Sequence, residues 1–111
     1  MEQYPECTSL HLDGEIDVYV VPRLRECLAG IWARTSSPCV IVDLSKVTFC
    51  DAAGVAVLLF AQKIMSGAGR RLVLTGVSRP VGRVLRASGA ISSFEIHQSV
   101  EHVLADLAGR G

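Results

Sequence analysis

Histidine, serine and acidic side chains are the residues of this chain that could bind a metal or assemble a catalytic site. The histidines are His11, His97 and His102, and none lies beside acidic or thiol partners at metal-site spacing. No motif places a serine, a histidine and an aspartate as a catalytic triad, and no pair of carboxylates stands out. We therefore expect a protein that is not an enzyme and that carries no metal and no cofactor.

The four cysteines, Cys7, Cys27, Cys39 and Cys50, are scattered along the sequence. Their separations do not match the paired close spacing of a zinc site, and a cytosolic chain of this size needs no disulfide framework. We interpret them as thiols of the core. Cys50 directly precedes the segment that starts at Asp51, so a redox-sensing role remains a less favoured alternative.

Asp51 begins the segment Asp-Ala-Ala-Gly-Val at residues 51–55, which opens a long apolar stretch. An aspartate is suited to cap a helix here, because its carboxylate accepts from exposed backbone N–H groups and faces the positive end of the helix dipole. Gly54 would permit close packing of that helix. These structural roles are sufficient by themselves to explain Asp51 and Gly54 at these positions. They are also compatible with a docking role for the same segment.

Hydrophobic periodicity predicts strands that alternate with helices, which is typical of an α/β fold. Leu10 and Leu12 alternate with polar residues before the Asp-Gly pair that ends at Gly14, which predicts a strand entering a turn. Residues 43–50 are expected to form a loop, and Ser78 is the expected N-cap of a helix. The other expected elements are helices over 22–34, 52–65 and 100–107, and strands over 39–42, 72–74 and around 94–96. The helix over 52–65 is apolar almost all round, so we expect it to be the best-buried helix.

Composition and charge indicate which partners are disfavoured. The 111 residues include 11 basic and 11 acidic side chains, so the net charge favours neither nucleic acid nor anionic lipid. The first nine residues lack the organisation of a signal peptide, and the longest apolar run, residues 52–61, is shorter than the roughly 20 residues that cross a bilayer. We expect a single domain over residues 1–111 that is cytoplasmic, binds no nucleic acid directly and does not insert into a membrane.

Four short strings occur along the chain in a fixed order. They are Leu-Asp-Gly-Glu-Ile-Asp at 12–17, Val-Ile-Val-Asp-Leu-Ser at 40–45 with Val-Thr-Phe at 47–49, Asp-Ala-Ala-Gly-Val at 51–55, and Leu-Arg-Ala-Ser-Gly at 85–89. Together they resemble the STAS domain family, and within it the bacterial anti-sigma factor antagonists. The resemblance extends from about residue 10 to residue 107. It implies a small mixed β-sheet packed with about four helices.

The resemblance also implies a function and a set of site residues. Such antagonists bind an anti-sigma factor, often a serine kinase, so that a sigma factor is released; phosphorylation of the first hydroxyl residue in Asp-Ser-Ser-Gly or Asp-Ser-Thr-Gly breaks the complex. Here that phospho-acceptor position is Ala52, and Ala53 follows it, so neither can be phosphorylated. Asp17 matches an acidic residue that the family places near the same surface. The partner-binding residues implied are Asp17, Asp51, Ala52, Ala53, Gly54 and Val55.

Two other functions stay open at this point. As the STAS subunit of a lipid or solvent-tolerance ABC transporter, the domain would bind the ATPase, and the alanines at 52 and 53 would need no explanation. As a scaffold of a larger stress-sensing assembly, it would be phosphorylated at another hydroxyl, such as Thr48 or Ser45. We rank the anti-sigma factor antagonist first, because the strings keep the order of that family, and the scaffold last.

Overall fold

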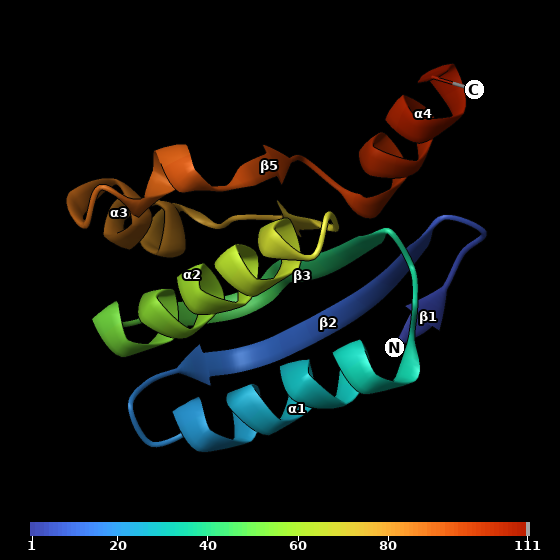
Figure 1. Cartoon of the computed structure of the whole chain (residues 1–111). Helices are drawn as coiled ribbons and strands as arrows, with labels where there is room; N and C mark the ends of the chain where they lie inside the picture. Colours follow the sequence, from blue (N-terminus) through green and yellow to red (C-terminus); the bar gives the residue numbers. More distant parts are fainter. Residues whose placement is uncertain (111) are drawn as a thin grey trace.

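The computed structural model describes residues 1–110 and contains one five-stranded β-sheet with helices on both faces (Figure 1). The strand order is β1-β2-β3-β4-β5; β1 is antiparallel to β2, and the other neighbours are parallel. The predicted mixed α/β fold is therefore confirmed. The elements are β1 (Glu2–Gln3), β2 (Cys7–Ile16), α1 (Val21–Arg34), β3 (Cys39–Cys50), α2 (Ala52–Gly67), β4 (Arg71–Thr75), α3 (Arg79–Ala87), the 3-10 helix η1 (Ala90–Ser93), β5 (Glu95–His97) and α4 (Val100–Arg110).

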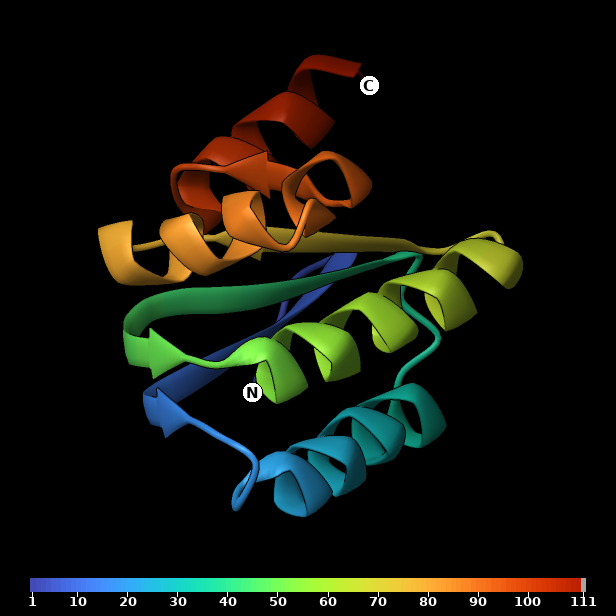
Figure 2. The same cartoon turned by 90° about the vertical axis from the view of Figure 1, so that its left-hand side faces the viewer.

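The central strands β3 and β4 are buried on both faces of the sheet. Successive side chains of a strand point to opposite faces, so an unbroken apolar run supplies two cores. Val40 and Val42 belong to the larger cluster, which α1, α2 and α3 cover. Cys39 and Ile41 belong to a second cluster, which Val103 of α4 covers on the other face. Figure 2 shows α1 and α2 side by side along the first face.

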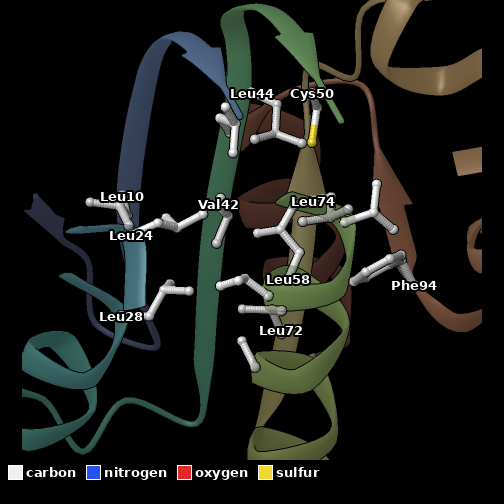
Figure 3. Packing of buried hydrophobic residues seen from close by; sticks show 14 of the residues in the cluster. Leu10, Leu24, Leu28, Val42, Leu44, Cys50, Leu58, Leu72, Leu74 and Phe94 are labelled. Carbon is white, nitrogen blue, oxygen red and sulfur yellow. The ribbon is translucent and has the colours of Figure 1, made fainter. Parts of the chain in front are cut away.

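The helices follow the predicted pattern closely, with one qualification for α2. That helix buries six residues, compared with three each in α1 and α3, so it is the best buried of these three. Figure 3 shows Leu28 of α1 and Leu58 of α2 on the same side of the sheet as Val42. Phe60 and Ile64 of α2 are nevertheless exposed, so its outer side is uncovered. Among residues 1–110, no helix has both the length and the apolar character that crossing a bilayer requires.

The predicted loop over residues 43–50 is wrong, because β3 continues without interruption to Cys50. The second half of β3 pairs with β2 alone, since its pairing with β4 ends at Asp43. In this half Leu44, Val47 and Cys50 are buried and the residues between them are exposed. That spacing of three comes from register shifts between β2 and β3 and conceals the period of two that identifies a strand.

Two local predictions concern the ends of elements, and one of them is wrong. The predicted turn at Gly14 is wrong: β2 begins at Cys7 and passes through Gly14, whose φ of +86° accompanies one of the register shifts. Ser78 does occupy the N-cap position of α3, but its side chain makes no capping bond. Its hydroxyl instead donates to the carbonyl oxygen of Val47 at 3.2 Å, which ties α3 to the extended part of β3.

Candidate functional site

The ends of β2 and β3 bring Asp17 and Asp51 to one edge of the sheet. The two strands are parallel, and Ile16 pairs with Cys50, so the residues that follow them lie side by side. The Asp51 N–H donates to the carbonyl oxygen of Ile16 at 3.0 Å. The carboxyl ends of parallel strands are where open α/β sheets generally place their binding sites. The structure thus joins two acidic residues that are far apart in the sequence.

Asp51 holds two segments together through its carboxylate. Oδ1 accepts from the Gly54 N–H at 3.0 Å, which confirms Asp51 as the N-cap of α2. Oδ2 accepts from the Val18 N–H at 3.1 Å. Bonds to an ionised acceptor are stronger than neutral ones, so this carboxylate fixes the start of α2 against the turn that precedes α1.

Asp17 orders that turn from its other end. Its Oδ1 accepts from the N–H groups of Tyr19 at 3.0 Å and Val20 at 3.2 Å, an arrangement in which an aspartate side chain stabilises a tight turn. Asp17 and Asp51 therefore both use their carboxylates on backbone N–H groups of the turn, and Asp51 also on the start of α2. Their role is to shape the surface, and other side chains project from it.

The projecting side chains are apolar, and the sequence analysis missed them. Tyr19 is 87% exposed and Val18 is 57% exposed, although both are large. Ala52 beside them is exposed, and Ala53 is half-buried. The available signal was two bulky apolar residues in the short connection between Asp17 and the first helix. We call residues 17–19 and 51–53 the helix-start surface.

Gly54 and Val55, the two remaining predicted site residues, lie beneath this surface. Val55 is buried in the main core. A Cβ atom added to Gly54 would lie 2.7 Å from both Cys50 Sγ and Ile16 Cγ2, closer than packed atoms approach. The absence of a side chain is what lets α2 start against the ends of β2 and β3. These two residues support the surface from below.

Cys50 lies next to the helix-start surface but is buried. Burial, with a smaller contribution from the Asp51 carboxylate, raises the pKa of the Cys50 thiol to about 11. The thiol is therefore protonated at neutral pH, when a thiolate would be the reactive form. Cys7 and Cys39 are likewise buried, and burial raises the pKa of each thiol; Cys27 is partly exposed, and all four are free. The interpretation as core thiols holds for the three buried cysteines.

Ser9, His11 and Asp43 form a hydrogen-bonded chain across β2 and β3. His11 Nε2 lies 3.2 Å from Ser9 Oγ, and His11 Nδ1 lies 2.8 Å from Asp43 Oδ2, in the order of a hydrolase triad. Ser9 has no exposed surface, so its hydroxyl is closed to a substrate. Although burial alone would raise the pKa of Asp43, hydrogen bonds from His11, Ser45 and Thr75 hold it below its ordinary value. These hydrogen bonds therefore link β2 to β3.

No group of three or more histidine, cysteine, aspartate or glutamate side chains in the part of the chain that the structure describes is arranged to hold a metal ion. The candidate site is the helix-start surface. It consists of an ordered turn and a helix start from which large apolar side chains are exposed. Such a surface can bind another protein.

The fold is that of the STAS class of domains. The structure is similar to the crystal structure of an anti-sigma factor antagonist from Mycobacterium paratuberculosis, with a TM-score of 0.84, 21% identity and coverage of 95% of this chain and 88% of that one. It is also similar to the anti-sigma factor antagonist SpoIIAA in its unphosphorylated form, with a TM-score of 0.80, 20% identity and coverage of 98% and 94%.

The sequence comparison agrees with the fold. The family model of the STAS domain matches residues 1–103, and the chain therefore belongs to the STAS domain family. A curated relative, the anti-sigma-B factor antagonist of Staphylococcus epidermidis, is 28% identical over 88 residues, which cover 79% of this chain and 81% of the relative.

Proposed function

We propose that this protein is an anti-sigma factor antagonist that binds an anti-sigma factor through the helix-start surface and so frees a sigma factor. Membership of the STAS family and the name of the curated relatives support the proposal. The observation that carries it is the exposure of Val18 and Tyr19 beside Ala52, where β2 and β3 end. The protein acts by binding, without catalysis.

The helix-start surface has the physical properties of a binding site. Exposed tyrosine is enriched among the residues that contribute most to protein–protein affinity, because it buries a large rigid ring and keeps a polar end. Three backbone hydrogen bonds from Val18, Tyr19 and Val20 to carboxylates order the turn before a partner arrives. A preordered segment loses less conformational entropy on binding. At Ala52 a methyl group lets a partner approach the helix closely.

The partner cannot switch this surface by phosphorylation at the family position. Ala52 and Ala53 have no hydroxyl, so an anti-sigma factor of the serine kinase type would bind without modifying either residue. A phosphate there would add about 1.5 to 2 negative charges beside Asp51. We therefore infer that the antagonist stays competent for binding and that its control lies elsewhere, for example in its amount.

The alternative functions have less support. The curated relatives carry the name of anti-sigma-B factor antagonists, and this gives no support to a subunit of an ABC transporter. Ser45 and Thr48 are exposed and could accept phosphate, but the Ser45 hydroxyl donates to Asp43 in the strand network. With equal numbers of acidic and basic residues, direct binding to nucleic acid is disfavoured, and we place the protein in the cytoplasm with its partner.

A release assay tests the proposed function. A sigma factor and its anti-sigma factor from the same organism would be purified as a complex and titrated with the full chain. We expect free sigma factor to appear in proportion to the added chain, and Tyr19→Ala to reduce the release. A stable complex of the three proteins, or no displacement at any ratio, would contradict the proposal.

A further inference from the structure

The outer edge of β2 is free over most of its length. On that side β1 pairs only with Thr8 and Ser9, so Leu10 to Glu15 have no neighbouring strand among residues 1–110. Backbone N–H and C=O groups at such an edge can form a ladder with an added extended segment.

A hollow of about 320 Å³ follows this edge between β2 and α1. Leu12 and Ile16, which point toward the helices, line it together with Asp13 and Glu15, which point to the other face of the strand. None of the residues that line the hollow comes from β3, the strand on the inner side of β2, so the hollow lies toward the outer edge of β2. The α1 side of the hollow includes Leu24, so an apolar side chain can be buried there.

The charges along the edge indicate what can occupy it. Asp13 and Glu15 are exposed, and the structure shows no hydrogen bond or ion pair for either side chain within the described residues. Arg23 of α1 also lines the hollow, which leaves a net charge of one negative unit from two carboxylates and one guanidinium. If β2 of a second copy of this chain paired antiparallel with this edge about Gly14, Asp13 of each copy would lie opposite Glu15 of the other. Like charges directly opposite each other are destabilising. An added segment with basic side chains would not be repelled by Asp13 and Glu15.

We propose that the free edge of β2 binds an extended segment of a protein partner in which basic and apolar residues alternate. The backbone of the segment pairs with residues 10–15, its apolar side chains enter the hollow beside Leu12 and Leu24, and its basic side chains lie beside Asp13 and Glu15. The hollow also includes Ile16 and Val20, which flank the turn of the helix-start surface. The inference therefore rests on the proposed function in assigning the segment to the same partner.

The test uses the isotope-labelled full chain and a short capped peptide of alternating valine and lysine, so it does not depend on the anti-sigma factor. We expect amide shifts centred on residues 12–16 and 20–24 and slower hydrogen exchange along the β2 edge. Asp13→Asn combined with Glu15→Gln should weaken binding about 2- to 30-fold, from two exposed ion pairs, while thermal melting stays unchanged. Two control peptides replace lysine by glutamate or methylate alternate backbone nitrogens, and neither should bind.

Several results would overturn the inference. They are no shift at millimolar valine-lysine peptide, shifts confined to another surface, equal binding of either control peptide, unchanged affinity in the double variant, and self-association of the chain through β2. Failure of this test leaves the release assay as an independent measure of the proposed function. If the peptide binds at the β2 edge but no sigma factor is released, the edge site is retained and the proposed antagonist function is rejected.

Discussion

Replacing Ala52 by aspartate should leave folding nearly unchanged while it removes partner binding. Ala52 is exposed at the first position of α2, immediately after the capping Asp51. A carboxylate in the first helical turn gains about 0.3 to 1 kcal/mol from the helix dipole, which offsets the helix propensity of up to about 0.7 kcal/mol lost with alanine. Repulsion from Asp51 opposes part of that gain. The net change in unfolding free energy should stay within about 1 kcal/mol, which corresponds to less than about 8 °C in melting temperature.

The effect on binding should be much larger. In the proposed complex the new charge would be pressed into an interface that fits a methyl group. An unpaired charge that loses its water costs on the order of 2 to 5 kcal/mol. Each 1.4 kcal/mol is a factor of ten in affinity, so the dissociation constant should rise roughly 30-fold to several thousand-fold.

Thermal melting and calorimetric titration with the anti-sigma factor, performed side by side, measure both quantities. Ala105→Asp is the matched control, because Ala105 is exposed on α4, which covers the opposite face of the sheet. The control should bind as the wild type does. If Ala52→Asp melts normally and also binds as tightly as the wild type, the helix-start surface is not the docking site and the reasoning fails.

Four further predictions concern stability, cysteine reactivity and binding. Gly54→Ala should lower the unfolding free energy by about 1 to 3 kcal/mol in urea titrations, because its Cβ would overlap Cys50 Sγ; an unchanged midpoint would contradict the packing argument. The hydrogen-bonded pair with Arg71 holds the pKa of Glu95 below its ordinary value of 4.5, so its stabilisation is present at neutral pH and is lost as pH falls through the folded-state pKa. Glu95→Gln should therefore be less stable than wild type at pH 7, and this difference should shrink at pH 3. A thiol reagent at neutral pH should label Cys27 first, and mass spectrometry should detect Cys50 labelling only after denaturation. Oxidising buffer should change neither stability nor binding.

The sequence by itself determined the helices and the cap at Asp51. The spacing of Leu24, Leu28 and Ile31 predicts the buried stripe of α1, and those three residues are buried. An aspartate before a run of helix formers predicts a capped helix, and its carboxylate accepts from Gly54. These features depend on interactions within a few residues of each other, so local pattern is sufficient to predict them.

Only the tertiary structure decided the second half of β3 and the composition of the site. Residues 43–50 form a strand because β2 lies beside them, and their burial period of three follows from register shifts that no local pattern contains. Val18 and Tyr19 have large side chains that composition would assign to a core, yet both are exposed. Asp17 within the same turn accepts from the Tyr19 N–H, and Asp51 at the end of the neighbouring strand accepts from the Val18 N–H. Strand pairing and exposure depend on contacts between segments far apart in the chain, which is why the sequence alone could not predict them.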